Sequence, residues 1–286
     1  MSPKLILNDG CAMPQLGLGL MRFGAETETA AVMGRAAAAG YRLFDGAAVY
    51  GNEAQMGQGL RACGQARGDV FVTTKLWNTQ HGRDKPRAAL AESLSRLGLD
   101  RIDLYLIHWP MPMVDLYVET WRALIDLQAE GLIGSIGVSN HTIDHLRRLI
   151  DETGVVPAVN QIEMHPRFQQ RALNAFHTEH GIVTQAWSPF GGGGTGAVPL
   201  LAEPVLSQIV AKHACTASQV VLRWLTRSGA SAIPKATSDR HLAENLASFA
   251  IDLDEADLAA IDGLDSHLGR TGPDPRTFAI TSVADI

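Results

Sequence analysis

Cysteine is scarce in this sequence, with only Cys11, Cys63 and Cys215 among 286 residues. An odd number of widely separated cysteines does not suit a disulfide framework, and none of the three has the spacing of a metal-binding motif. The histidines show no ligand spacing either, so we expect no bound metal. Reduced thiols of this kind are typical of a cytoplasmic protein.

An excess of positive charge is also missing. The 24 Lys and Arg residues are outnumbered by 30 Asp and Glu residues, which gives a formal net charge of −6. Without a basic surface the protein cannot hold a phosphate backbone, so we expect no nucleic-acid partner. Any bound phosphate group has to be held by a few local side chains.

Long hydrophobic runs are absent from the chain. No stretch reaches the ~18 apolar residues of a membrane span, and the opening MSPKLILNDG lacks the pattern of an export signal. We therefore expect no membrane segment and no export. A Pro/Ser-rich linker is missing as well, and 46% of the residues are hydrophobic, so we expect residues 1–286 to form a single domain.

What the sequence does contain is a regular alternation of short apolar runs with stretches of helical period. The runs that we interpret as strands are residues 15–20, 41–45, 70–76, 103–109, 135–140, 157–161, 182–187 and 231–234. Gly40 and Gly131 are the expected ends of two intervening helices. Such alternation is typical of parallel strands joined by helical crossovers. We predict an α/β fold, a single (β/α)8 TIM barrel with an N-terminal β-hairpin cap that turns at residues 8–10.

An open doubly wound sheet is the alternative architecture. That fold places a G-x-G-x-x-G turn after its first strand. Gly17, Gly19 and Gly24 miss this spacing. The dinucleotide-binding fingerprint is therefore absent, which favours the barrel.

Polar side chains gather at the carboxyl ends of the predicted strands, where the loops of a barrel form the mouth. Asp45 closes the second strand, Lys75 and His108 lie near the ends of the third and fourth, and Tyr50 follows Asp45 in a loop. A buried Lys needs an acidic partner, so we expect an ion pair between Asp45 and Lys75. The ammonium should lower the pKa of Tyr50 from its usual value of about 10, and so make it a proton donor. His108 can then bind a substrate oxygen.

Each of these residues also has an ordinary interpretation. Asp45 can form a turn, Tyr50 can lie at the surface, Lys75 can extend toward solvent and His108 can be a hydrogen-bonded core residue. Four such residues at three successive strand ends nevertheless favour a catalytic group.

At these residues the sequence resembles the aldo-keto reductase superfamily, and the similarity runs nearly from end to end. The segments that carry it, in order, are FDGAAVYGNE, TTKLWN, LDRIDLYLIHWP, GLIGSIGVSN, VVPAVNQIEMHP, QAWSPFG and IPKATSDRHLAENL. The chain is most similar to the bacterial branch that includes 2,5-diketo-D-gluconate reductases, with the short tail GRTGPDP. The resemblance implies a (β/α)8 barrel that binds NADP(H) in extended form and reduces aldehydes or ketones.

The resemblance also implies roles for particular residues. The catalytic positions are matched by Asp45, Tyr50, Lys75 and His108. The cofactor positions are matched by Ser139, Asn140, Gln161, Trp187, Ser188, Pro189, Phe190, Gly191, Lys235, Ala236, Thr237, Ser238, His241, Glu244 and Asn245. The residues from Ser139 to Gln161 match positions that bind the nicotinamide carboxamide, and Trp187 matches the residue that stacks on the nicotinamide ring. The residues from Ser188 to Gly191 match the loop that covers the pyrophosphate, and those from Lys235 to Asn245 match the adenosine end. The walls of the substrate pocket are matched by Met21, Trp77 and Trp109.

Two features of the chain bear on phosphate binding. Lys235 and Ser238 precede a helical segment whose N-terminal amides and dipole suit an anion, although Ser238 can also serve simply as an N-cap. The glycine run at residues 191–194 is either a flexible connection, which we favour, or a cradle of amides around phosphate.

The chain departs from its close relatives at three positions. They carry Ser directly after the lysine and Arg six positions after it, where this chain has Ala236 and His241. The loss of a hydrogen bond and a bidentate fork should weaken selectivity for NADP(H), so we expect NAD(H) to be accepted, unless Arg240 turns inward. Met21 replaces an aromatic wall residue, and a flexible side chain there suits substrates of varied shape.

Two other functions stay open from the residues alone. Lys75 can act as a Schiff-base nucleophile in an aldolase-like barrel, although a pairing with Asp45 argues against it. A non-catalytic, cofactor-sensing protein on the same scaffold is the other, as the ion-channel subunits related to this superfamily suggest. We expect a monomer that acts on a small carbonyl compound, and no motif names that compound.

Overall fold

The computed structural model describes residues 2–21, 23, 26–192 and 199–281. Eight of its strands belong to one sheet. They are β3 Leu18–Gly19, β4 Leu43–Asp45, β5 Phe71–Leu76, β6 Ile102–Ile107, β7 Ile133–Ser139, β8 Val159–Glu163, β9 Val183–Trp187 and β10 Ser231–Ala232. Each overlaps one of the predicted apolar runs.

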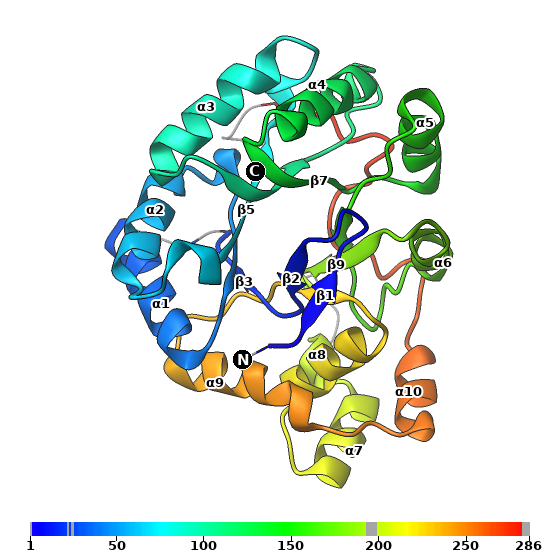
Figure 1. Cartoon of the computed structure of the whole chain (residues 1–286). Helices are drawn as coiled ribbons and strands as arrows, with labels where there is room; N and C mark the ends of the chain where they lie inside the picture. The colour runs from blue at the N-terminus through cyan, green and yellow to red at the C-terminus, as the bar shows by residue number, and fades with distance from the viewer. Residues whose placement is uncertain (1, 22, 24–25, 193–198, 282–286) are drawn as a thin grey trace.

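All neighbouring strands of the sheet are parallel, and their order is β10-β9-β8-β7-β6-β5-β4-β3. The sheet closes on itself, because Leu16 forms a parallel bridge with Ala232 and the N–H of Gly17 donates to the Ala232 carbonyl at 2.9 Å. The predicted (β/α)8 barrel is confirmed. Helices surround the strands, as the view along the barrel in Figure 1 shows.

The helices follow the strands as crossovers and extend beyond the last one. They are α1 Glu26–Ala39, α2 Glu53–Ala62, α3 Lys85–Leu97, α4 Tyr117–Ala129, α5 Ile143–Thr153, α6 Arg171–His180, α7 Pro204–His213, α8 Ala217–Arg227, α9 Asp239–Ala247 and α10 Glu255–Asp262. The predicted helix ends are confirmed at Gly40 and Gly131, whose φ angles of 115° and 81° lie in the left-handed region that glycine adopts at little cost.

An antiparallel hairpin of β1 Lys4–Ile6 and β2 Ala12–Pro14 lies in front of the barrel centre in Figure 1. Its buried side chains Leu7 and Met13 join a cluster inside the barrel with Leu43, Leu104 and Leu106. The predicted hairpin cap is therefore present, and its apolar side chains help to exclude water from the barrel interior.

Two strand ends differ from the prediction in a way that bears on the site. β6 ends at Ile107, so His108 belongs to the following loop, and β8 continues past Gln161 to Glu163. Glu163 pairs in register with Trp187 at the end of β9. A buried carboxylate thus reaches the carboxyl end of the barrel.

A tail without helix or strand, residues 263–281, follows α10. Part of it lines the same cavity as the strand ends. Among the helices that the structure describes, none is long and apolar enough to cross a bilayer.

Candidate active site

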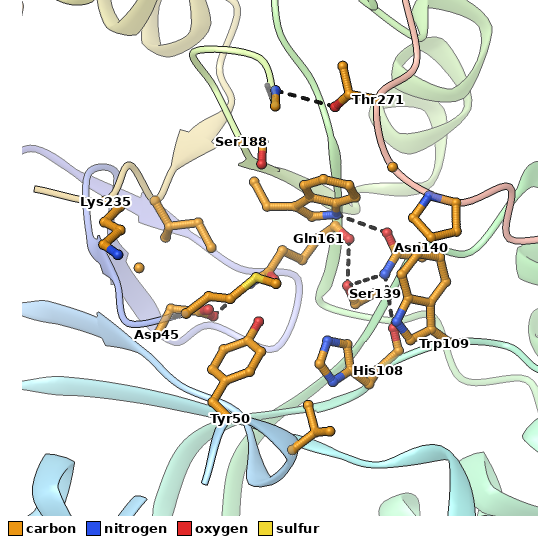
Figure 2. A pocket seen from close by; sticks show the side chains of 18 of the residues that line it. Asp45, Tyr50, His108, Trp109, Ser139, Asn140, Gln161, Ser188, Lys235 and Thr271 are labelled. Carbon is orange, nitrogen blue, oxygen red and sulfur yellow. Dashed lines mark hydrogen bonds between the residues drawn. The ribbon is translucent and has the colours of Figure 1, made fainter. Parts of the chain in front are cut away.

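A cavity of about 640 Å³ opens at the carboxyl end of the barrel strands. The polar residues that line it from strand ends and adjoining loops include Asp45, Tyr50, His108, Ser139, Asn140, Gln161 and Lys235. Figure 2 shows these side chains converging from different strands. The barrel thus brings together residues that lie far apart in the sequence.

The predicted ion pair between Asp45 and Lys75 is present and buried. The Nζ atom of Lys75 lies 2.5 Å from Oδ1 of Asp45, and the two residues are 0% and 1% exposed. Lys75 Nζ also donates to the carbonyl of Gly46 at 2.8 Å. Nε2 of Gln161 donates to Asp45 Oδ2 at 2.7 Å. Both oxygens of Asp45 therefore accept hydrogen bonds, which favours the carboxylate over the protonated form.

The pKa values of this pair are set by burial and by the partners. Burial alone lowers the pKa of Lys75, but Asp45 and Tyr50 raise it above its usual value. Burial raises the pKa of Asp45, and Lys75 and Gln161 oppose that rise. We assign a charged pair, because both Asp45 oxygens accept hydrogen bonds. Lys75 is thus a cation held beneath the cavity.

This cation lies against Tyr50. Nζ of Lys75 is 5.1 Å from the centroid of the Tyr50 ring. The pKa of Tyr50 is nevertheless raised, because burial outweighs the lowering by Lys75. The predicted lowering was therefore wrong in direction, although the predicted influence of Lys75 is present. A phenol in this state keeps its proton at neutral pH and can donate it.

His108 faces the phenol from the neighbouring loop. Its ring centroid lies 5.8 Å from that of Tyr50 and 5.2 Å from that of Trp77, both in edge-on arrangements. Burial and the nearby Lys75 hold the pKa of His108 well below its usual 6.5, so the imidazole is neutral. Its buried Nδ1 has no hydrogen-bond partner among the described residues. A neutral ring can still donate one hydrogen bond to an oxygen in the cavity.

A hydrogen-bonded network lies next to His108 (Figure 2), whose carbonyl accepts a hydrogen bond from Nδ2 of Asn140 at 3.1 Å. The hydroxyl of Ser139 donates to the carbonyl of Gln161 at 2.8 Å, and Nδ2 of Asn140 donates to Ser139 Oγ at 3.1 Å. Nε1 of Trp187 donates to Asn140 Oδ1 at 2.9 Å. Asn140 has a φ of 61°, and such left-handed backbone costs free energy unless its surroundings hold it. The four residues are thus fixed relative to one another.

The loop after β9 also lines the cavity through Ser188, Pro189, Phe190 and Gly191. It turns sharply, since the N–H of Gly191 donates to the carbonyl of Ser188 at 2.9 Å. Gly192 continues the cavity wall. Residues 193 and 194 of the predicted glycine run lie outside the described residues.

The segment before α9 begins at Lys235, which lines the cavity and whose Nζ lies 4.9 Å from the centroid of the Phe23 ring. The side chain of Ala236 is buried, and the Thr237 carbonyl accepts a hydrogen bond from Arg35 at 2.8 Å. Ser238 is the N-cap of α9 and accepts from the N–H of His241 at 3.2 Å.

Arg240 does not turn inward. Its side chain is 71% exposed and its guanidinium contacts Glu244 Oε1 at 3.0 Å and His241 Nε2 at 2.9 Å. Asn245 lies buried on the same helix. Arg240 therefore does not replace the bidentate phosphate partner that is missing at position 241.

Met21, Trp77 and Trp109 line the cavity. The sequence analysis did not identify Phe278, whose ring stacks on Trp109 with centroids 4.1 Å apart. It also missed Glu163, although that residue stands in a quoted motif. Among the residues that the structure describes, no three His, Cys, Asp or Glu side chains form a group able to hold a metal ion.

Known proteins resemble the chain over nearly its whole length. The model of the aldo/keto reductase family matches residues 15–266. A protein named aldo-keto reductase from Mycobacterium sp. (strain JLS) is 46% identical over 280 residues, which are 98% of this chain and 99% of that protein. Methylglyoxal reductase DkgA from Escherichia coli O157:H7 is 47% identical over 278 residues, which are 97% and 98% of the two chains.

Solved structures agree with these matches. The crystal structure of a Gox0644 mutant in complex with NADPH has 45% sequence identity and a TM-score of 0.91. That likeness covers 98% of this chain and 100% of the other. The family model, the relatives and the barrel therefore lead to one conclusion: this chain belongs to the aldo/keto reductase family.

Proposed function

We propose that this protein reduces aldehydes and ketones to alcohols with NADP(H), and that Tyr50 donates the proton. The observation that carries the proposal is the buried Asp45–Lys75 ion pair, whose ammonium lies against the Tyr50 phenol at the floor of a large cavity. The NADPH in the Gox0644 complex supports the choice of cofactor.

The side chains of the cavity fit such a cofactor. Ser139, Asn140 and Gln161 offer the hydroxyl and amide groups that suit a carboxamide, and Trp187 offers an aromatic face for the nicotinamide ring. Lys235 stands at the adenosine end, close to the N-terminus of α9, where a phosphate is stabilised. When bound, the nicotinamide supplies a hydride to the carbonyl carbon.

The chain's own residues handle the carbonyl oxygen. Tyr50 and the neutral His108 each donate a hydrogen bond to an oxygen placed between them, which polarises the carbonyl. As negative charge develops on that oxygen, the hydroxyl proton of Tyr50 moves to it and completes the alcohol. Lys75, anchored by Asp45, stabilises the phenolate that is left until a proton from solvent restores the phenol.

The substrate half of the cavity is largely apolar. Trp77, Trp109 and Phe278 form its walls. Such walls suit small neutral carbonyl compounds, and curated relatives are named methylglyoxal reductases. We infer that methylglyoxal and aromatic aldehydes are substrates, and that residues 1–286 act as one domain, as a monomer in the cytoplasm.

A Schiff-base mechanism at Lys75 is the weaker alternative. The Lys75 side chain is 0% exposed and its pKa is raised by Asp45 and Tyr50 despite the opposing effect of burial. A nucleophilic lysine needs the neutral amine, which this environment disfavours. Trapping of a substrate adduct on Lys75 with borohydride would revive that alternative.

An initial-rate screen with NADPH and NADH side by side tests the proposed function. We expect steady oxidation of NADPH with methylglyoxal or an aromatic aldehyde, and measurable oxidation of NADH, because Ala236 and His241 leave the 2′-phosphate without its usual partners. The preference for NADPH should stay below about a thousandfold, or about 4 kcal/mol. A larger preference contradicts weak selectivity, and no NADPH oxidation with any carbonyl favours a cofactor-sensing protein.

The variant His241→Arg tests the explanation for the weak preference for NADPH over NADH. A guanidinium at this position adds a bidentate partner for phosphate, so we expect the preference for NADPH to rise about tenfold. The kcat with NADPH should stay the same, since position 241 lies on α9 away from Tyr50.

A further inference from the structure

The carboxylate of Glu163 holds the tail that follows α10. Glu163 is 1% exposed at the end of β8, beside Trp187. Its Oε1 atom accepts hydrogen bonds from the backbone N–H of Thr271 at 2.7 Å and from the Thr271 hydroxyl at 2.5 Å. Its Oε2 atom accepts from the N–H of Gly272 at 2.9 Å. One buried side chain therefore satisfies two consecutive backbone amides of a segment more than 100 residues away.

Glu163 is charged in this setting. Burial alone raises the pKa of its carboxyl group, but hydrogen bonds from His165, Thr271 and Gly272 lower it below the usual value. Nε2 of His165 lies 3.2 Å from Oε1. Hydrogen bonds to an ionised acceptor are about twice as strong as those between neutral groups. The tail is thus attached to the end of β8 by charge-assisted hydrogen bonds.

The tail packs so closely at Gly269 and Gly272 that neither position has room for a side chain. A Cβ atom on Gly272 would lie 2.4 Å from Cη2 of Trp187, and one on Gly269 would lie 1.7 Å from the carbonyl oxygen of Arg167. These two glycines allow the tail backbone to pack directly on the indole of Trp187 and on the loop after β8. Displacement of the tail would therefore leave one side of Trp187 unsupported.

Thr271 links the tail to a second segment. Its hydroxyl group donates to Glu163, and its Oγ1 atom accepts a hydrogen bond from the N–H of Gly192 at 3.3 Å (Figure 2). Gly192 continues the loop that begins at Ser188, directly after Trp187. The loop proposed to cover the pyrophosphate is thus joined to Glu163 through one threonine.

Farther along, the same tail builds the wall of the substrate half. Phe278 stacks on Trp109 with ring centroids 4.1 Å apart. Nε1 of Trp77 donates to the carbonyl of Thr281 at 3.0 Å, and Nδ2 of Asn78 donates to that of Ile280 at 2.7 Å. The tail is therefore held at two places, by Glu163 at its middle and by the loop after β5 near its end.

We propose that Glu163 is a positioning residue that couples the two halves of the cavity, because its carboxylate holds the tail against Trp187 and, through Thr271, also holds the loop from Ser188 to Gly192. This inference rests on the proposed function of the cavity. Cofactor bound under that loop would tighten the tail, and loss of the carboxylate would loosen the cofactor loop and the substrate wall together.

Hydrogen exchange of residues 266–281, with and without NADPH, tests the coupling without requiring turnover. We expect NADPH to slow exchange in this segment of the wild-type protein. In Glu163→Gln the NH2 group of the glutamine side chain must face at least one of the donors of Thr271 and Gly272, so a hydrogen bond to the tail is lost. Hydrogen exchange of residues 266–281 should then be faster, and NADPH should no longer slow it. Exchange of the segment that is the same in Glu163→Gln and wild type overturns the proposal.

Kinetics provide the second readout. In Glu163→Gln we expect the KM for the carbonyl substrate and the dissociation rate of NADPH each to rise about tenfold, while kcat stays within about threefold. Thr271→Val, at an exposed position that tolerates the change, should speed NADPH dissociation about threefold. The double variant should be no worse than Glu163→Gln, since both changes remove the same linkage. Unchanged NADPH dissociation in both single variants contradicts the coupling.

Thr277→Val is the matched control. Thr277 belongs to the same tail, but among the residues that the structure describes its hydroxyl bonds only to the carbonyl of Asp274, at 3.5 Å, so neither kinetics nor exchange should change. A failure of the proposed function looks different. Wild-type protein would then oxidise no NADPH, whereas the exchange of residues 266–281 in Glu163→Gln would still decide whether the carboxylate holds the tail.

Discussion

Replacing Tyr50 with Phe is expected to lower the kcat of carbonyl reduction by about a thousandfold or more, with NADPH affinity within about threefold of wild type. The ring that packs edge-on to His108 is kept, and only the proposed proton donor is lost. The cofactor contacts proposed for Ser139, Asn140 and Gln161 do not include the Tyr50 hydroxyl. Single-turnover oxidation of bound NADPH measures the reductive step itself.

The control for this variant is Tyr117→Phe. Tyr117 begins α4 and packs against His141 and His145, outside the cavity, so its loss should leave kcat within about threefold. A Tyr50→Phe enzyme with undiminished turnover would remove Tyr50 from the proposed role.

Replacing Lys75 with Met should have two separate effects. Turnover should fall by about a hundredfold or more, since no cation remains to stabilise the phenolate of Tyr50. The free energy of unfolding should drop by about 3–5 kcal/mol, because the Asp45 carboxylate is left buried without its ion partner. Chemical denaturation and initial rates on the same preparation measure both quantities.

The double variant Asp45→Asn with Lys75→Met separates stability from catalysis. It removes both charges, so much of the lost stability should return, while turnover should stay as low as in Lys75→Met. Recovery of turnover in the double variant would contradict a catalytic contribution from the cation.

The barrel fold and the residues that meet at its catalytic site could be predicted from the sequence. Asp45, Lys75 and His108 stand at or just beyond strand ends, and the parallel barrel places those ends around one mouth. Periodicity and spacing are local properties of a chain, so eight strand positions and the hairpin cap could be identified without coordinates. The ion pair followed because a buried ammonium requires a partner.

The direction of the Tyr50 pKa could not be predicted in the same way. The sequence shows which charges can meet, but the penalty of burial depends on how much water the folded cavity excludes. In this structure that penalty exceeds the lowering by Lys75. The orientation of Arg240, which pairs with Glu244 at the surface, likewise depends on the packing of α9 and not on the spacing of residues.

Glu163 was missed because strand ends are uncertain by a few residues in a sequence-based prediction. The run at residues 157–161 was taken to finish at Gln161, whereas β8 reaches Glu163. Its partners Thr271 and Gly272 lie in a tail without periodicity, so no sequence pattern connects the two. Contacts of this kind become visible only once the tail is placed across the barrel mouth.

Titration of Tyr50 in wild-type protein and in Lys75→Met tests the central electrostatic claim most directly. The protein has four tyrosines, so ring-labelled tyrosine gives few NMR signals, and Tyr50→Phe identifies the one of interest. In wild type the pKa should lie above the usual value of about 10, so the phenol stays protonated at neutral pH and loses its proton only in alkali. We predict that this pKa rises further in Lys75→Met, since burial is then no longer opposed by the cation. A pKa that is unchanged or lower without Lys75 would contradict the account.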